Sequence, residues 1–329
     1  LVFSLVESAT LNGVRLFTEF KVTGAEEAEG SYLINSEDGR AIRGTWVVNA
    51  AGLFADTVSS IFGAEEFTIT PRKGEEFLLD RNASAFTSRV IFPVPSSVSK
   101  GMLVIPTVEG TTMVGPTADS VADKEDTATS RENFGKVFYS ARRLVPTVSE
   151  RDIITSFAGL RPVLEGDDFY IELSKKRARF VQVAGIQSPG LTASPAIAEY
   201  VTNILKKGGL HLVEDPGYRS EIPEVPRLRN LDLAGIDAAL KKDPAYGEIV
   251  CRCENISEAE VVAAIERGHT TLDGIKFYTR AGMGRCQGGF CSYKILKIIA
   301  RETGMSLDEI SKRGGMSWII RDRIGGRKV

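Results

Sequence analysis

The pattern of apolar and polar positions predicts short strands through most of the first half of the chain. Residues 22–48 have the pattern of short strands, and residues 37–40 (Glu-Asp-Gly-Arg) have the composition of a tight hairpin turn, so we expect a β-meander there. Between residues 67 and 116, Pro and Gly separate short apolar runs, which indicates a large antiparallel sheet. Residues 131–144 repeat apolar side chains at helical spacing and predict an amphipathic helix.

Two further segments combine a buried strand, a turn of small residues and a helix. In residues 46–62, a Trp-Val-Val-Asn strand runs into Ala-Ala-Gly before a helix. In residues 180–206, a strand leads through Gly-Ile-Gln-Ser-Pro-Gly into a longer helix. Turns of this kind are where α/β folds bring backbone N–H groups close to a ligand. The spacing alone fits an ordinary tight turn or helix cap equally well, so both interpretations stay open.

The last third of the chain has a different character. Residues 208–247 are rich in Pro and charge without sustained periodicity, which predicts a linker that wraps a surface. Beyond it, Gly residues separate short helical patterns that begin with capping residues. We expect four helices, followed by a basic tail, with starts near Ser257, Thr270 or Thr271, Cys291 and Ser306.

Composition and charge exclude several classes of protein. The 329 residues include 41 Lys and Arg against 43 Asp and Glu, and this balance argues against nucleic acid or an anionic membrane as the main partner. No apolar run reaches the ~18 residues that a transmembrane helix needs. The chain begins with Leu1 instead of Met, within what looks like the end of a helix. We therefore expect it to be a piece of a longer protein.

All four cysteines fall in two tight pairs near the C-terminus. Cys251 and Cys253 form a C-x-C motif, and Cys286 and Cys291 form a C-x4-C motif within a glycine-rich loop. This pattern predicts a four-thiolate metal centre in a reducing compartment, and we expect the cytoplasm. The C-x4-C loop is wider than the C-x2-C motif usual for zinc, which favours an iron–sulfur cluster. Structural zinc, disulfides and free thiols remain alternatives at this point.

The residues around these cysteines carry a resemblance to a known family. Residues 250–305, with Val-Cys-Arg-Cys-Glu-Asn-Ile-Ser and Gly-Arg-Cys-Gln-Gly-Gly-Phe-Cys, resemble the [2Fe–2S]-binding domain of the bacterioferritin-associated ferredoxin (BFD) type. The C-x4-C pair departs from the C-x2-C of the small ferredoxin and looks like the variant fused to flavin dehydrogenases. The resemblance implies that Cys251, Cys253, Cys286 and Cys291 bind a [2Fe–2S] cluster, with zinc as the alternative.

A second resemblance covers residues 1–206. The motifs Val-Val-Asn-Ala-Ala-Gly at 47–52, Pro-Arg-Lys-Gly-Glu at 71–75, Ala-Gly-Leu-Arg-Pro at 158–162 and Gly-Ile-Gln-Ser-Pro-Gly at 185–190 resemble FAD-dependent oxidoreductases of the D-amino-acid oxidase superfamily. Among these, the chain is most similar to glycerol-3-phosphate dehydrogenases, with 2-hydroxyglutarate oxidases next.

The two resemblances imply a mixed fold, α/β plus α+β. They predict a partial FAD/NAD(P)-binding-type domain, a large antiparallel substrate sheet and a small helical [2Fe–2S] domain. The Gly-rich phosphate-binding turn of this superfamily has no match in the chain, and we expect on the order of 140–150 residues to be missing before Leu1. The expected domains are the FAD-binding remainder (1–66 and 174–207), the substrate domain (67–173), the linker (208–247), the [2Fe–2S] domain (248–305) and the tail (306–329).

The resemblance also assigns flavin-binding residues. Small residues after the first strand would line the nucleotide side of FAD, and the second turn would open a helix whose N-terminus faces the flavin ring. The alternative is an ordinary helix cap. The expected FAD-binding residues are Asn49, Ala50, Ala51, Gly52, Gly185, Gly190, Leu191, Thr192 and Ser194.

By the same resemblance, Arg161 would bind the phosphate or carboxylate of a small anionic substrate, because guanidinium groups bind such anions bidentately. A structural role for Arg161 is the alternative. Glu75 is either a base or a solvated charge. The two histidines, His211 and His269, lie outside the flavin region, so the catalytic base stays unassigned.

The function implied is oxidation of glycerol 3-phosphate or a similar hydroxy acid at FAD, with electrons passing through [2Fe–2S] to a flavoprotein or iron–sulfur partner subunit. Three alternatives remain. The chain could be a non-catalytic cluster-binding electron relay, a zinc-stapled interaction module, or an enzyme of the 2-hydroxyglutarate or amino-acid oxidase type.

Overall fold

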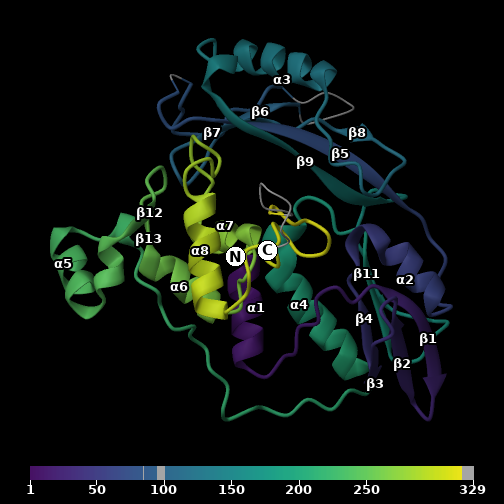
Figure 1. Ribbon diagram of the computed structural model, residues 1–329. Coiled ribbons are helices and arrows are strands. Elements are labelled where there is room, and N and C mark those ends of the chain that lie inside the picture. Colours follow the sequence, from purple (N-terminus) through teal and green to yellow (C-terminus); the bar gives the residue numbers. More distant parts are fainter. Residues whose placement is uncertain (84, 95–100, 321–329) are drawn as a thin grey trace, which may run out of the picture. The chain divides into compact units, whose positions relative to one another are not determined.

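The computed structural model describes residues 1–83, 85–94 and 101–320, and these form two compact units (Figure 1). One unit runs from Thr18 to Asp215, and the other joins residues 1–17 to the chain from Pro216 onward. The sequence motifs group residues 1–66 together, whereas the structure assigns residues 1–17 to the C-terminal unit. Within the described residues, no helix has the length and apolar character needed to cross a membrane.

The unit from Thr18 to Asp215 begins with the predicted meander. Strands β1 (Val22–Ala28), β2 (Ser31–Ser36) and β3 (Ala41–Gly44) pair in that order, all antiparallel. At the expected turn, Ser36 N–H donates to the Arg40 carbonyl at 2.9 Å, and Gly39 has a φ of +83° that favours glycine.

A second sheet holds the two strand–turn–helix segments side by side. Its order is β10 (Tyr170–Leu173), β11 (Phe180–Ala184), β4 (Val47–Asn49), with β11 and β4 parallel. Every residue of β11 is buried, as expected of a parallel strand covered on both faces. The helices that follow these strands are α2 (Ala55–Ile61), entered through the short 3-10 helix η1 (Gly52–Phe54), and α4 (Gly190–Lys207).

The predicted antiparallel sheet is confirmed and is built on two long strands. Strand β5 (Ile69–Leu79) pairs with β9 (Ile153–Leu164) along its whole length, from Ile69↔Leu164 to Leu79↔Ile153. The helix predicted over residues 131–144 is α3 (Arg131–Leu144), whose buried Phe138 packs against Phe77 of β5. The remaining elements are β6 (Leu103–Pro106), β7 (Thr112–Gly115), β8 (Asp119–Ser120) and η2 (Glu150–Asp152).

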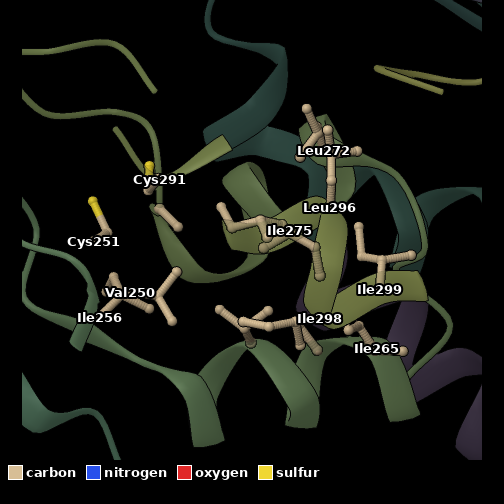
Figure 2. Packing of buried hydrophobic residues seen from close by; sticks show 14 of the residues in the cluster. Val250, Cys251, Ile256, Ile265, Leu272, Ile275, Cys291, Leu296, Ile298 and Ile299 are labelled. Atoms are coloured by element: carbon tan, nitrogen blue, oxygen red, sulfur yellow. The ribbon is translucent and has the colours of Figure 1, made fainter. Parts of the chain in front are cut away.

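The C-terminal unit is a small helical domain whose main apolar core is shown in Figure 2. A second apolar cluster lies around Leu228, Ala239 and Tyr246. Ser257 and Glu260 form the predicted capping box, and Thr271 caps the next helix. The first helix of the chain also belongs to this unit, because Phe3 packs edge-on against His269. Its elements are α1 (Val2–Leu11), η3 (Leu228–Asn230), α5 (Leu233–Lys242), η4 (Pro244–Gly247), β12 (Ile249–Cys251), β13 (Ile256–Ser257), α6 (Glu258–Glu266), α7 (Leu272–Thr279) and α8 (Ser292–Thr303).

Two expectations for this unit are wrong. The predicted linker 208–247 contains the helix α5, capped by the Asp232 side chain and packed through Ala239 against Leu228 and Tyr246. The fourth helix, expected from Ser306, is only a turn. Its capping hydrogen bond from Ser306 N–H to Glu309 forms at 2.8 Å, but the chain turns again at Gly314 before a helix can develop. Residues 321–329 of the expected basic tail lie outside the described residues.

Candidate cofactor and substrate sites

The structure brings the four cysteines together in the C-terminal unit. Cys251 ends β12 and Cys291 is the N-cap of α8, and both are buried at 2% exposure. Cys253 lies in the turn before β13, and Cys286 lies in the glycine-rich loop after α7, both half-buried. Figure 2 shows the sulfurs of Cys251 and Cys291 at one end of the apolar core. Cys251 and Cys291 are therefore part of the core, Cys253 packs against it, and Cys286 lies in the glycine-rich loop.

The thiols form two pairs, each with one member from each motif. The Cys253 and Cys286 sulfurs are 3.7 Å apart. A hydrogen bond with the Cys291 thiol lowers the pKa of Cys251 to about 6 and raises the pKa of Cys291. None of the four forms a disulfide. The arrangement is thus two thiol pairs placed next to each other.

The two thiol pairs match the ligand pattern of a two-iron cluster. A [2Fe–2S] cluster needs two thiolates on each of two irons, whereas structural zinc needs four ligands around one centre. The thiols line a cavity of about 630 Å³ together with Arg252, Arg285, Phe290 and Lys294.

The glycine-rich loop gives the cavity its shape. A Cβ at Gly284 would lie 2.2 Å from the Cβ of Cys253, so only glycine allows the second motif to approach the first this closely. Backbone N–H groups of Phe290 and Gly288 donate to Cys286 and lower the pKa of its thiol. Such donors also stabilise the negative charge of cluster sulfurs.

The two expected flavin-binding turns lie at one edge of the parallel sheet. Because β4 and β11 run in the same direction, the residues after Asn49 and after Ala184 leave the sheet on the same side. Asn49 is buried, and its side-chain amide donates to Gln182 Oε1 and to the Ala55 carbonyl, each at 2.8 Å. Gln182 in turn donates to Ser59 Oγ at 2.6 Å. These hydrogen bonds fix the exit of β4 against β11.

The turn after β4 leaves free space beside its backbone, as the binding of a nucleotide requires. Ala50 and Ala51 are exposed, and a Cβ at Gly52 would meet nothing within 4 Å. Gly52 has a φ of +57°, which glycine adopts readily. The 3-10 helix η1 that begins there packs against β5 and β9. The first flavin turn therefore adjoins the sheet that carries Arg161.

The turn after β11 leads into an uncapped helix. Gly190 begins α4, and the N-cap residue Pro189 contributes no side-chain hydrogen bond. Leu191 and Thr192 are exposed in the first turn. The first N–H groups of a helix have no intrahelical acceptor, so this end of α4 suits an anionic or carbonyl ligand atom. Ser194 instead donates from Oγ to the Leu191 carbonyl at 2.8 Å.

Glycine is required at both ends of the second turn. A Cβ at Gly190 would lie 2.6 Å from Ile186 Cγ2. Gly185 has a φ of +70°, and its Cβ would lie 3.0 Å from both the Asp168 carbonyl and Leu164 Cβ. The residues present therefore fit FAD at both turns.

Arg161 lies half-buried on β9, directly across from Arg72 on β5. Its guanidinium extends over Gly74, where a Cβ would lie 2.5 Å from Nη2, and donates to the Thr117 carbonyl at a long 3.4 Å. Burial lowers the pKa of Arg161 and raises the pKa of nearby Glu76. A guanidinium that is desolvated and weakly bonded suits an incoming anion.

Glu75 and the two histidines lie in other surroundings. Glu75 is fully buried, and its carboxylate accepts from Ser130 N–H and Asn133 Nδ2, each at 2.7 Å, so it holds the start of α3 and is not a solvated charge. His269 packs between Phe3 and Tyr278 in the C-terminal unit, and His211 is exposed beyond α4.

Sequence reasoning missed Gln182. It is fully buried in the middle of β11, and it links Asn49 to Ser59 and, at 3.3 Å, to Glu65. A polar amide inside an otherwise apolar strand was the signal, because a buried amide needs hydrogen-bond partners.

With this geometry in place, the comparisons with known proteins define the class. Residues 1–204 match the family described as DAO, FAD dependent oxidoreductase, and residues 249–301 match the BFD-like [2Fe-2S] binding domain. The chain therefore belongs to the FAD-dependent oxidoreductases of the DAO family and carries a BFD-like domain after them. These two family matches confirm both expected cofactors, FAD and [2Fe–2S].

Individual relatives show which members of the family the chain resembles. The chain is 40% identical over 320 residues to a glycerol 3-phosphate dehydrogenase of Caloramator mitchellensis, which covers 96% of this chain and 66% of the relative. It is 24% identical to the anaerobic glycerol-3-phosphate dehydrogenase subunit A1 of Haloferax volcanii, covering 98% of this chain and 61% of the relative. The chain thus spans less than two thirds of the length of these relatives.

Among solved structures, the chain resembles the FAD-bound L-alpha-glycerophosphate oxidase of Mycoplasma pneumoniae. The TM-score is 0.62 at 28% identity, covering 67% of this chain and 59% of the oxidase. The expected fold class is confirmed.

Proposed function

We propose that the protein containing this chain is an FAD-dependent dehydrogenase that oxidises glycerol 3-phosphate, or a similar hydroxy acid, and passes the electrons through a [2Fe–2S] cluster to a partner. One observation carries the proposal. A flavoenzyme fold similar to glycerol 3-phosphate dehydrogenases is followed, in the same chain, by four thiols arranged in two adjacent pairs.

Arg161 is the residue proposed to bind the substrate. Its guanidinium is half-buried over Gly74, and its hydrogen bond to the Thr117 carbonyl is long enough to be replaced by a phosphate oxygen. Burial removes hydrogen bonds between the guanidinium and solvent. A bound phosphate or carboxylate would replace them with charge-assisted hydrogen bonds. Arg72 lies directly across on β5, and its guanidinium forms an ion pair with Asp167 at 3.4 Å.

Asn49, Gly52 and the start of α4 are proposed to hold the cofactor. FAD, when bound, would accept the two electrons and the hydrogen that leave the substrate carbon. The N–H groups of Leu191 and Thr192, in the exposed first turn of α4, would stabilise negative charge on the flavin ring. Asn49 would keep the nucleotide side in position, since its amide is fixed by Gln182 and the Ala55 carbonyl.

Cys251, Cys253, Cys286 and Cys291 are proposed to bind the cluster, two to each iron. A cluster handles single electrons, so it suits transfer to another protein more than direct reaction with oxygen. The similarity to a relative named as a subunit A1 supports a further subunit, and we propose a flavoprotein or iron–sulfur protein as acceptor.

A substrate screen with the intact protein tests this function. We expect glycerol 3-phosphate to bleach the flavin absorbance anaerobically and to reduce an artificial dye. L-2-hydroxyglutarate and amino acids serve as competing substrates, because one arginine serves phosphate and carboxylate alike. If no hydroxy acid or amino acid reduces the flavin while the cluster is present, the relay alternative replaces the dehydrogenase.

A further inference from the structure

The surface around the cysteine cavity has an unusual composition. Its lining includes Arg252, Arg285 and Lys294 but no acidic residue. It also includes the side chain of Phe290, which is 85% exposed. We call these four residues the cavity rim.

Helix α8 extends the rim along one face. Tyr293 is 58% exposed, and Lys297, one turn further on, lies with Nζ 5.0 Å from its ring centre. Glu248 and Glu258 line an adjoining cavity together with Lys294 and Lys297, and Glu258 pairs with Arg301 at 2.7 Å. The surface nearest the thiols is therefore basic and aromatic.

Neutralising the cluster explains only part of this composition. Arg and Lys close to four thiolates offset their negative charge. That role needs no large apolar side chain in water, yet Phe290 immediately precedes Cys291 and is almost fully exposed. Aromatic and Arg side chains together are typical of the energetic centre of a protein interface, with charged residues at its edge.

We propose that the cavity rim, with Tyr293 and Lys297, is the docking surface for an acidic electron-acceptor protein. Charge complementarity identifies this occupant, because a basic surface attracts and orients an acidic partner. Phe290 supplies the apolar contact at the centre. In the docked complex, one electron passes from the reduced cluster to the acceptor, no bond between the two proteins forms or breaks, and any proton that the reduced acceptor takes up comes from solvent. This inference rests on the proposed function, since it names the partner of the same electron path.

Binding of an acidic flavodoxin to the intact, cofactor-loaded protein tests the docking surface. We expect the Kd to weaken about tenfold between low and physiological ionic strength, and about tenfold in the double variant Lys294→Glu with Lys297→Glu. Phe290→Ser should weaken binding by a similar factor without the same dependence on salt. Lys242→Glu on α5 is the matched control, and we expect its Kd to stay within about twofold of the parent. Visible absorbance and iron content must show that each variant keeps its cluster.

Two outcomes would overturn the proposal. The flavodoxin Kd could be unchanged in the rim variants, or basic cytochrome c could bind as tightly as flavodoxin. If the flavodoxin Kd is unchanged but the variants slow substrate-driven reduction of the cluster, the rim serves the flavin part of the same protein.

The two proposals fail in different measurements. A protein that binds flavodoxin through the rim but is not reduced by any substrate retains the docking surface and loses the proposed dehydrogenase function. The reverse result loses only the docking surface.

Discussion

The cysteine site and the flavin site are built in opposite ways. All four thiols come from residues 251–291, and Cys251 and Cys291 belong to one apolar core, so a short stretch of sequence contains the whole site. The proposed flavin and substrate residues come from β4, α4 and β9, which lie far apart in sequence and depend on strand pairing for their positions. The first site depends on local geometry, and the second depends on long-range pairing. Each prediction below tests one side of this contrast.

The largest effect should come from removing a thiol. We expect Cys253→Ser to lose nearly all of the cluster, because one iron would have a single thiolate and serine is a poor substitute ligand. Iron and acid-labile sulfide assays with visible absorbance measure this. Ser292→Ala, which removes only a hydrogen bond from Oγ to the Gly288 carbonyl, is the control. A Cys253→Ser protein with full iron content would mean that the thiols do not act as one centre.

Gly284→Ala tests whether the close approach of the Gly284 backbone to Cys253 is as important for cluster binding as the cysteine ligands themselves. The new Cβ would lie 2.2 Å from the Cβ of Cys253, so the two motifs would have to separate. We expect cluster content to fall several-fold while the helical unit stays folded by circular dichroism. Gly247→Ala is the control, because its Cβ meets only the flexible end of Leu240 at 3.1 Å. Equal cluster content in the two variants would mean that the cluster does not require the close approach of Gly284 to Cys253.

On the flavin side, Arg161→Ala should raise the substrate KM and lower kcat/KM by at least tenfold, or about 1.4 kcal/mol of transition-state binding. Steady-state kinetics of the intact enzyme with a dye acceptor measures both. Arg151→Ala, an exposed arginine just before the same strand, should leave them unchanged. An Arg161→Ala profile like that of the control would assign Arg161 a structural role.

Gln182→Met tests the link between the two halves of the flavin site. Methionine has nearly the same length but cannot bond Asn49 or Ser59, so buried polar groups lose their partners. We expect the free energy of unfolding to fall by about 1–3 kcal/mol and FAD to bind more weakly. Denaturant unfolding and flavin titration measure these two effects.

Its control is Thr202→Ala on α4, which removes only a local hydrogen bond from Oγ to the Ala198 carbonyl. If Gln182→Met loses stability but binds FAD normally, the network supports the fold alone.

The contrast explains what the sequence could predict. The helix over residues 131–144 and the cysteine motifs are local patterns, and the structure has α3 with those bounds and the thiols in contact. The errors have local causes as well. Helix α5 has a weak apolar pattern inside a Pro-rich segment, and the expected helix at Ser306 has a cap without enough residues to follow it.

Roles that depend on distant partners could not be predicted in the same way. From the sequence, Glu75 could be either a base or a solvated charge, but the packing of α3 on the sheet buries it against Ser130 and Asn133. Gln182 gains its role only when β11 pairs with β4. Sequence spacing contains no information on which strands meet, so such roles follow only from the assembled sheets.

The smallest expected effect is electrostatic and confined to the unit from Thr18 to Asp215. Asp56 at the start of α2 forms an ion pair with Lys124 at 2.6 Å. Burial opposes its ionisation, but hydrogen bonds from Lys124 and the Ile69 N–H hold the pKa of Asp56 below its ordinary 3.8. A carboxyl whose pKa is lower in the folded state stabilises the protein above its unfolded pKa and loses that contribution as pH falls through the folded pKa.

We therefore expect Asp56→Asn to lower the free energy of unfolding by about 1 kcal/mol at pH 7 and by progressively less below pH ~4. Unfolding followed at several pH values measures this, and a cost that persists unchanged in acid would mean that packing, and not charge, holds Asp56 in place.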